Sequence, residues 1–376
     1  MFKSKQLDQG KIFFSFVFNR LSIIDLTDTA SQPMVSNNKE NLMMFNGEIY
    51  NYKELKEILL SKGVTFNSKN SDTEVLLKGL SVFGLDFINN IIGQFAIAFY
   101  DIKNKKIHLI RDRVGQKPLF FNLSDRSLVF GSNLISVADL SGYKQIDDKE
   151  IGNFFNYGVI KSPNTIYKNI YKLKPAEIIT FNLEKNLQAQ NHIYWSPTDE
   201  VDEKTFIDDE FYELFSSSIN YRLESDVPVA NFLSGGIDSS SIIKNLFDNK
   251  KNINTFSAIY SDNKYDESFW IESVKEKYKT NHFQEKLDLN FDFDTLLAVI
   301  NIFDEPYCDP SIVPSFILSR LISKKYKVAI SGDGGDELLG GYLRTSLSWI
   351  LQINLKNYIQ KYILFIHHFW ELEIIF

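Results

Sequence analysis

The feature that most constrains the fold is Asn231–Ser240, where an apolar, strand-like run meets a helix-like run across two adjacent glycines. Glycines at such a corner let the backbone approach a ligand closely, and the unpaired amides at the start of the helix attract anions. A second glycine-rich segment, Ser331–Glu337, also follows an apolar run. Because ligands bind beyond the carboxyl ends of the strands in an open parallel sheet, we expect the two segments to share one crevice.

This crevice is predicted to bind phosphate groups, although it is not a Walker A loop, because no Gly-Lys-Ser/Thr follows the glycines. Taken singly, an adjacent pair of glycines is explained as well by a tight turn, and an acidic glycine-rich loop by a solvated turn. The two segments together favour a ligand site. Asp238 and Asp336 are suited to hold Mg²⁺ against a pyrophosphate, since this cation is usually bound through one or two carboxylates and phosphate oxygens.

Strand-length and helix-length runs alternate from about Trp195 onward. The strand-like runs are Val229–Leu233, Thr255–Tyr260 and Val328–Ile330, and the helical patterns are Phe206–Leu223, Ser239–Phe247, Ser268–Tyr278 and Pro314–Ser323. Such alternation predicts a doubly wound parallel sheet. The polar stretch Pro197–Lys204 precedes it, so we expect one domain over residues 1–195 and a second over residues 205–376.

Short aromatic and β-branched runs dominate the first half and predict sheets with helices packed on them. One helix is expected from Tyr52 to Gly63, and a second begins at a capping box formed by Ser71 and Glu74. In Gln94–Tyr100, large Phe and Ile side chains alternate with alanines, so both faces of this strand must be covered. Antiparallel hairpins are expected among the runs Ile107–Ile110, Leu119–Asn122 and Leu128–Phe130, which Gly115 and Ser124-Asp125 separate.

The composition, with 44% hydrophobic and 24% charged residues, is that of a folded globular chain. A net charge of −7 without a polybasic run argues against a nucleic-acid or anionic-membrane partner. Cys308 is the only cysteine, which excludes an intrachain disulfide and suits a reducing cytoplasm. We expect it to be a small, partly buried thiol rather than a nucleophile. Ile12–Phe18 is expected to be a strand rather than a signal sequence, and Tyr362–Trp370 is too short for a membrane span of roughly 20 residues.

Leu233–Ser240 resembles the signature loop of the ATP-pyrophosphatase (PP-loop) superfamily, and its combination with Val328–Tyr342 is similar to asparagine synthetases. Asp304–Pro306 and Asp309–Pro314 also match that family. In such enzymes ATP adenylates the β-carboxylate of aspartate and releases pyrophosphate, and ammonia then attacks the acyl-adenylate.

Carried over position by position, the resemblance gives roles to individual residues of this half. The residues that would contact ATP are Leu233, Ser234, Gly235, Gly236, Asp238, Ser239, Ser240, Ala258, Ser331 and Gly332. Asp238 and Asp336 would hold the metal. Asp333 stands where the family has an acidic residue that is important for forming the adenylate.

The first half resembles the class II glutaminase domain of asparagine synthetases. The matching segments are Asn19–Leu26, Gln32–Met34, Phe45–Tyr52, Ser71–Glu74 and Arg111–Leu119. This resemblance implies a four-layer αββα N-terminal-nucleophile fold for the first domain. The resemblance of the chain as a whole runs from about Asn19 to Tyr342.

By this resemblance Arg20 would pair with the α-carboxylate of glutamine, a task suited to a guanidinium group. Asn46 and Gly47 would supply the oxyanion hole, and Glu48 and Asp72 would hold the amino end of the substrate. These positions also have ordinary explanations. Asn46-Gly47 suits a hairpin turn, and the charge of Asp72 suits the first turn of a helix without any ligand.

Both ends of the chain depart from the family pattern. Phe2 stands where the family has its catalytic cysteine, and no cysteine precedes Cys308, so we expect the glutaminase step to be lost. Lys356 and Lys361 lie too near Tyr342 to match the lysine that stabilises the adenylate-forming transition state in the family. We therefore expect a chain that is truncated at both ends.

The leading hypothesis is a cytoplasmic ligase of the asparagine synthetase type that uses ATP, Mg²⁺, aspartate, and glutamine or ammonia, with a homodimer as its assembly. Two alternatives stay open. One is an amidotransferase or a β-lactam-synthetase-like enzyme that acts on another carboxylate, and the other is a non-catalytic fragment. GMP and NAD synthetases share the Ser-Gly-Gly-x-Asp-Ser loop but are poor candidates, because they do not explain the motifs between Arg20 and Lys117.

Overall fold

A computed structural model describes the chain over residues 2–8, 13–125, 127–198, 207–260, 266–287, 293–343 and 347. Contacts between Cα atoms divide the chain into two compact units. Unit 1 comprises Met1–Val229 and Leu287–Val328, and unit 2 comprises Ala230–Lys286 and Ala329–Phe376. The division into domains over residues 1–195 and 205–376 stays a prediction. Lys356, Lys361 and the apolar stretch Tyr362–Trp370 lie outside the described residues.

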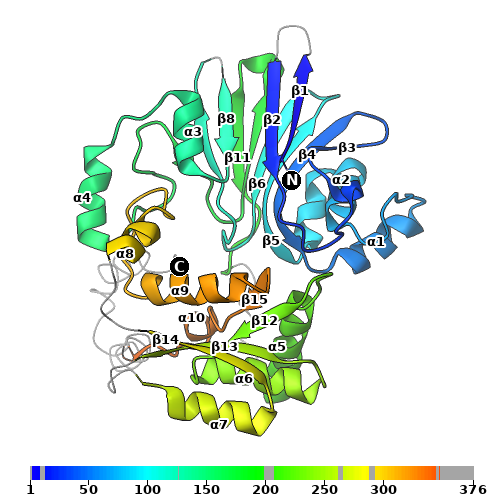
Figure 1. Cartoon of the computed structure of the whole chain (residues 1–376). Helices are drawn as coiled ribbons and strands as arrows, with labels where there is room; N and C mark the ends of the chain where they lie inside the picture. The colour runs from blue at the N-terminus through cyan, green and yellow to red at the C-terminus, as the bar shows by residue number, and fades with distance from the viewer. Residues whose placement is uncertain are drawn as a thin grey trace, which may run out of the picture. The chain divides into compact units, whose positions relative to one another are not determined.

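Unit 1 is built on a six-stranded sheet in the order β11-β10-β6-β5-β4-β3 (Figure 1). Its strands are β3 (Met34–Val35), β4 (Asn41–Ile49), β5 (Gly93–Asp101), β6 (Lys106–Arg111), β10 (Glu177–Asn182) and β11 (Gln188–Ile193), all paired antiparallel. In β5 the side chains of Phe95, Ile97 and Phe99 enter one core. Those of Ala96 and Ala98 enter another. The prediction that both faces of this strand are covered is confirmed.

Helices α1 (Tyr52–Ser61) and α2 (Asp72–Phe83) cover the first of these faces (Figure 1). Leu55 of α1 and Leu76 of α2 lie in the same core as Phe95. Their nearly complete burial stabilises each side chain by about 2 kcal/mol relative to an exposed one.

A second sheet, in the order β8-β7-β9, covers the other face. Its strands are β7 (Phe120–Leu123), β8 (Leu128–Gly131) and β9 (Tyr171–Lys172). In β7, Phe121 packs toward the six-stranded sheet, and the neighbouring Phe120 packs toward helix α3 (Leu134–Ser141). The layers are therefore helix, sheet, sheet and helix, which is the αββα arrangement that the resemblance implied.

The N-terminal strands β1 (Phe2–Asp8) and β2 (Phe13–Asn19) form an antiparallel pair. Phe14 and Phe16 of β2 join the core between the two larger sheets. The strand expected at Ile12–Phe18 is thus present as β2, while Ile12 itself lies outside the described residues.

Two local predictions were only partly right. The Ser71 hydroxyl accepts a hydrogen bond from the Glu74 amide at 3.1 Å, but the Glu74 carboxylate accepts the amides of Asn67 and Ser68 instead of reaching back to Ser71. Only half of the capping box therefore forms. The hairpin expected at Ser124-Asp125 is confirmed, because β7 and β8 pair antiparallel across it. The hairpin expected around Gly115 is wrong, because β6 and β7 belong to different sheets.

Unit 2 contains a four-stranded sheet in the order β14-β13-β12-β15. Its strands are β12 (Val229–Phe232), β13 (Asn254–Tyr260), β14 (Asn281–Leu287) and β15 (Val328–Ile330). Strands β12 and β13 pair in parallel, with Asn231 opposite Thr255. Helices α6 (Ile237–Asp248) and α7 (Ser268–Tyr278) contact each other on one side of this sheet (Figure 1). The prediction of a parallel sheet in this half is confirmed.

The remaining helices are α4 (Asp148–Tyr157), α5 (Asp208–Arg222), α8 (Phe293–Ile300), α9 (Ile312–Ser323), α10 (Gly335–Leu339) and the short 3₁₀ helices at Asp28–Ala30, Gly84–Asn90 and Leu183–Lys185. Over the part of the chain that the structure describes, no helix has the length and apolar character needed to cross a membrane.

Candidate functional site

A cavity of about 280 Å³ lies in unit 1 and is called the amide cavity below. Its lining includes the residues that the resemblance assigned to glutamine: Arg20, Asn46, Gly47, Glu48 and Asp72. They come from the loop after β2, from β4 and from the start of α2. Gln32 and Lys117 also line the cavity, although the sequence motifs that contain them predicted no role for either side chain.

Gly47 lies inside β4, opposite Phe95 of β5, so Asn46-Gly47 is not a hairpin turn. Its φ of +150° is unfavourable for a residue with a side chain. A Cβ atom here would overlap the Gln94 carbonyl oxygen and lie 2.8 Å from Phe95 Cα. The backbone of β4 and β5 thus comes together at the cavity wall more closely than any residue but glycine allows.

Asp72 is the first residue of α2 and is 4% exposed. Its carboxylate accepts the amide of Ile49 at 3.2 Å and that of Thr73 at 2.6 Å. Burial is the main reason that the pKa of Asp72 is raised to about 7, and the charge of Glu48 acts in the same direction. Burial also raises the pKa of Glu48, which Lys117 opposes. Two carboxyl groups that resist ionisation therefore face one cavity.

The loop that carries Lys117 is held in place by the side chains of Arg111 and Asp112. The buried Asp112 carboxylate accepts the amides of Phe95, Gln116 and Lys117 at 2.8 to 3.1 Å. The Arg111 guanidinium donates to the carbonyl oxygens of Lys117, Gly115 and Leu173. These bonds satisfy an irregular backbone, which explains why the chain crosses between sheets here instead of forming a hairpin.

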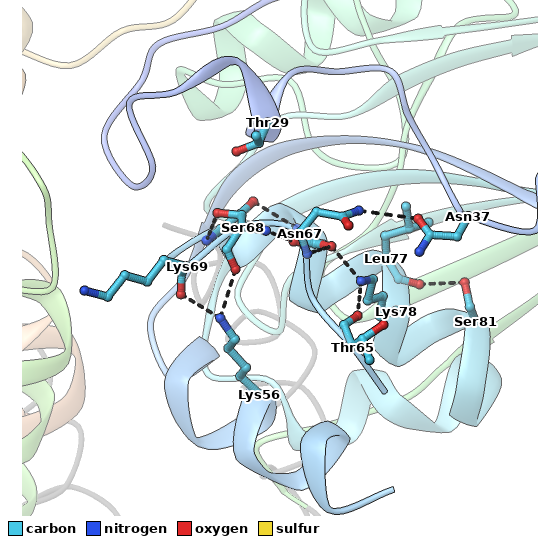
Figure 2. Close-up of polar contacts among 12 residues, drawn as sticks. Thr29, Asn37, Lys56, Thr65, Asn67, Ser68, Lys69, Leu77, Lys78 and Ser81 are labelled. Atoms are coloured by element: carbon cyan, nitrogen blue, oxygen red, sulfur yellow. Dashed lines mark hydrogen bonds and ion pairs between the residues drawn. The ribbon is translucent and has the colours of Figure 1, made fainter. Parts of the chain in front are cut away.

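The loop before α2 is held by two lysines, as Figure 2 shows. Lys56 Nζ donates to the carbonyl oxygens of Ser68 and Lys69 at 3.0 and 2.6 Å. Lys78 Nζ donates to that of Thr65. The position of Asp72 at the start of α2 is thus set by polar contacts that come from both α1 and α2.

Arg20 is anchored by its own loop, residues 20–29, called the Arg20 loop below. Its guanidinium donates to the carbonyl oxygens of Thr27 at 2.8 Å, Ile24 at 3.0 Å and Asp25. A guanidinium has five N–H donors, so these three bonds orient the group and leave donors for a ligand.

In unit 2, the first glycine-rich segment follows β12 and opens α6. The Leu233 amide donates to the Phe256 carbonyl at 2.9 Å, which extends the pairing with β13. The hydroxyls of Ser234 and Ser239 lie 3.0 Å apart, and that of Ser234 accepts the Gly236 amide at 3.2 Å. The loop is therefore closed by its own hydroxyls at the start of a helix.

Ser240 and Ala258, which the resemblance also assigned to ATP, are both half-buried. The Ser240 hydroxyl is buried and has no hydrogen-bond partner among the described residues. Ala258 lies half-buried in β13, and Gly235 has a φ of +82°. A Cβ atom on Gly235 would lie 2.8 Å from Trp270 Cβ, so α7 packs directly on this corner.

The second glycine-rich segment touches the first at Asp238. A Cβ atom on Gly332 would lie 2.9 Å from Asp238 Cβ, and one on Gly335 would overlap the Asp238 carboxylate. Asp333 accepts the Ser331 hydroxyl at 2.9 Å. The two segments therefore converge at one place, as expected from strands that end at the same edge of a sheet.

Negative charge accumulates at this contact. Burial raises the pKa of Asp238, and the charges of Asp336 and then Glu337 raise it further. No cluster of three or more His, Cys, Asp or Glu side chains that could hold a metal ion is found among the described residues. Two carboxylates with phosphate oxygens are nevertheless a usual donor set for Mg²⁺.

Two further segments behave differently from the expectations. Cys308 is exposed and not partly buried, because its segment lies on the surface and is held through its backbone amide to the Gly158 carbonyl at 2.8 Å. The Asp304 carboxylate accepts the Leu134 amide and the Asn133 side chain, both at 2.6 Å, and so caps α3. The sequence revealed this segment only as a family match and gave no sign of the capping role.

Comparison with known proteins gives two family models that together cover most of the chain. Residues 8–195 match a model described as a glutamine amidotransferase domain, and residues 210–365 match one described as asparagine synthase.

The curated relatives are longer than this chain. A provisionally named glutamine-hydrolysing asparagine synthetase of Methanocaldococcus jannaschii is 34% identical over 350 residues, which cover 86% of this chain and 66% of that protein. Glutamine-hydrolysing asparagine synthetase 1 of Bacillus subtilis is 29% identical over 327 residues. This match covers 87% of this chain and 51% of the B. subtilis protein. One of the solved structures that match is the glutamine phosphoribosylpyrophosphate amidotransferase of B. subtilis in complex with ADP and GMP, with a TM-score of 0.32 and 16% identity. The match covers 68% of this chain and 48% of the amidotransferase chain.

Proposed function

Because the chain belongs to the asparagine synthetase family of carbon–nitrogen ligases, we propose that it catalyses the ATP-dependent amidation of aspartate. A β-carboxylate oxygen attacks the α-phosphorus of ATP, and pyrophosphate leaves with the electrons of the broken P–O bond. Ammonia then attacks the carbonyl carbon of the β-aspartyl-adenylate, loses a proton and displaces AMP. The observation that carries this proposal is the contact of Gly332 and Gly335 with Asp238, which joins both glycine-rich segments.

The first segment supplies the phosphate contacts. The amides at the start of α6 and the hydroxyls of Ser234 and Ser239 present donors at one corner, where anions are favoured. The buried, unpartnered hydroxyl of Ser240 is a further donor that a phosphate oxygen would satisfy. Leu233 and Ala258 contact the nucleoside, and Asp333 acts in forming the adenylate.

Asp238 and Asp336 hold Mg²⁺ in this proposal. The raised pKa of Asp238, which owes part of its shift to Asp336 and Glu337, supports the assignment, because a cation would relieve the repulsion. When bound, Mg²⁺ would offset the charge of the pyrophosphate leaving group.

The amide cavity takes an α-amino acid in this proposal. Arg20 would bind its carboxylate, Glu48 and Asp72 its ammonium group, and Asn46 and Gly47 an oxyanion; what supports these roles is that all five residues line one cavity. Cys308 is the chain's only cysteine and does not line this cavity. We therefore propose that these 376 residues do not hydrolyse glutamine and that free ammonia is the nitrogen donor. The homodimer and the cytoplasmic location also stay proposals.

The test is pyrophosphate release from Mg·ATP by the full chain, with aspartate and either ammonium or glutamine. Release with ammonium but not with glutamine is expected. Asp333→Asn should reduce it, whereas Asp248→Asn at the far end of α6 is the matched control and should not. Release that does not depend on aspartate would mean that water attacks the α-phosphorus in place of the aspartate carboxylate, and it would refute aspartate as the acceptor. The absence of release under every condition would refute the ligase proposal and leave a non-catalytic chain.

A further inference from the structure

One peptide unit in the Arg20 loop is bound at both ends by opposite charges. The Ile24 carbonyl oxygen accepts a hydrogen bond from Arg20 Nη2 at 3.0 Å, and the adjoining Asp25 amide donates to Asp226 Oδ2 at 2.8 Å. Because the peptide unit is planar, its C=O and N–H cannot turn independently. A rotation that breaks the bond to Asp226 therefore also breaks the bond to Arg20.

The charges strengthen this arrangement. A guanidinium at the oxygen end and a carboxylate at the N–H end both polarise the peptide in the same direction, and hydrogen bonds to ionised groups are about twice as strong as neutral ones. The charges of Arg20 and Asp226 thus act on opposite ends of the peptide unit between Ile24 and Asp25. Arg20 lines the amide cavity, whereas Asp226 does not.

Asp25 has a backbone conformation that needs such support. Its φ of +52° is uncommon for a residue other than glycine, and the residue is 5% exposed. Its carboxylate accepts the Thr27 amide at 3.0 Å and the hydroxyls of Thr29 and Ser68. The Ser68 hydroxyl in turn accepts the Ser71 amide just before α2. A residue in this conformation persists when its surroundings hold it from several sides.

Asp226 lies in the connection between α5 and β12, and this connection belongs to unit 1, as α5 does. Glu224 of this connection pairs with Lys53 Nζ at 2.5 Å. At the end of α5, Tyr221 Oη donates to Glu54 Oε1 at 2.8 Å, and Arg222 lies over the Tyr50 ring at 5.3 Å. By sequence Asp226 falls in the stretch that matches the asparagine synthase model. A residue from that stretch therefore supports the amide cavity.

A second, weaker tether reaches the same loop. Lys327 Nζ donates to the Ser22 carbonyl oxygen at 3.3 Å, and Lys327 directly precedes β15. Asp226 lies three positions before Val229, the first residue of β12. Both tethers thus come from points where the chain enters a strand that ends in a glycine-rich segment.

We propose that Asp226 is a positioning residue of the amide cavity, which fixes the guanidinium of Arg20 through the peptide of Ile24 and Asp25. The identity of the ligand rests on the proposed function, whereas the positioning does not. The substitution Asp226→Asn keeps a side-chain oxygen that can accept the Asp25 amide, whereas Asp226→Ala removes it. This difference separates loss of the bond from loss of the charge.

The experiment measures hydrogen exchange of residues 20–30 in the full chain for the wild type, Asp226→Ala and Asp226→Asn. Loss of a charge-assisted hydrogen bond should speed exchange of the Asp25 amide and its neighbours about tenfold in Asp226→Ala. Asp226→Asn should stay within about threefold of the wild type, because the neutral bond remains. Asp209→Ala, an exposed acid in the first turn of α5, is the matched control and should leave exchange unchanged. Equal exchange in the wild type and Asp226→Ala, or equal acceleration in both Asp226 variants, would overturn the proposal.

Calorimetric titration with L-glutamine is the second measurement. Glutamine affinity should fall about tenfold in Asp226→Ala and be largely restored in Asp226→Asn. If the exchange pattern is as expected but the wild type binds no glutamine, the ligand assignment fails and the positioning role stands. If the wild type binds glutamine and Asp226→Ala binds it equally well, the positioning role fails and the ligand assignment stands.

Discussion

The buried carboxyl group of Asp72 predicts a specific dependence of stability on pH. Its pKa is raised from the ordinary value of 3.8 to about 7 in the folded chain, mainly by burial. Below pH 3.8 both the folded and unfolded states hold the proton, so this group does not favour either. Between pH 3.8 and 7 the unfolded state ionises freely while the folded state keeps the proton, so folding loses stability as the pH rises.

The size of the loss follows from the shift. A change from 3.8 to about 7, at 1.36 kcal/mol per pH unit, costs about 4 kcal/mol of folding free energy by pH 8. Asp72→Asn cannot ionise and removes this dependence. It also puts an amide group where the carboxylate accepted the amides of Ile49 and Thr73, at a constant cost of about 1 kcal/mol.

The assay is urea unfolding of the wild type and Asp72→Asn at intervals from pH 4 to pH 8. The stability of the variant relative to the wild type should rise by about 4 kcal/mol over this range, from a small deficit to a clear excess. Taking the difference between the two proteins cancels most other groups that titrate. A difference that stays constant within about 1 kcal/mol would refute the reasoning, because Asp72 would then ionise as easily in the folded chain as in the unfolded one.

Three further predictions concern other contacts. Asp238→Ala should weaken Mg·ATP binding at least about tenfold, since it removes a charged ligand worth about 1.5 kcal/mol or more. The midpoint of thermal unfolding without ligand should stay within about 3 °C of the wild type. An equally large loss of stability without ligand would contradict the role of Asp238 as a ligand. Gly335→Ala should displace the Asp238 carboxylate and slow pyrophosphate release. Gly152→Ala should not, because a Cβ atom there meets open space. Equal rates in the two variants would show that the contact between Gly335 and Asp238 is unimportant. Asp304→Ala should lower the free energy of unfolding in urea by about 2 kcal/mol, because two donors at the start of α3 lose their acceptor. An unchanged midpoint of urea unfolding would mean that water replaces the carboxylate.

The sequence predicted those parts of the fold in which local pattern and tertiary packing agree. The alternation of Phe95, Ile97 and Phe99 with alanines indicated a strand covered on both faces, and each set of side chains does enter a different core. The strand and helix on either side of Gly235 and Gly236 were predicted to within about two residues. In both segments the same residues that favour the element also pack it.

The errors come from side-chain contacts within short loops, where the pattern of residue types does not specify which backbone groups a charged side chain will bind. Gly115 carries a turn signal, but Arg111 and Asp112 bind the loop so that it crosses between sheets. Glu74 has the right spacing for a capping box, but its carboxylate accepts amides of the preceding loop, at Asn67 and Ser68. No local pattern shows which of two donors a carboxylate will accept.

The candidate site divides in the same way. Family motifs placed Arg20 and Asp72 in one cavity, although they lie on separate elements. Asp226 carried no motif, and its partner is the Asp25 amide, 201 positions earlier in the chain. A backbone amide has no sequence signature, so a residue that acts on another through a peptide unit is found only in the folded chain.

Both candidate sites bring acidic groups together in a way that folding alone does not require. Glu48 and Asp72 face one cavity, and burial raises the pKa of each. The pKa of Asp238 is raised by burial and by the charges of Asp336 and Glu337. A fold selected only for stability would avoid these carboxyl groups, since their burial and, at Asp238, the repulsion by Asp336 and Glu337 make ionisation costly. We propose that a cation would remove that cost in each case, namely an ammonium group at the cavity and a metal ion at Asp238. Because the same unfavourable pattern occurs in both units, binding of charged ligands explains it better than structural need does.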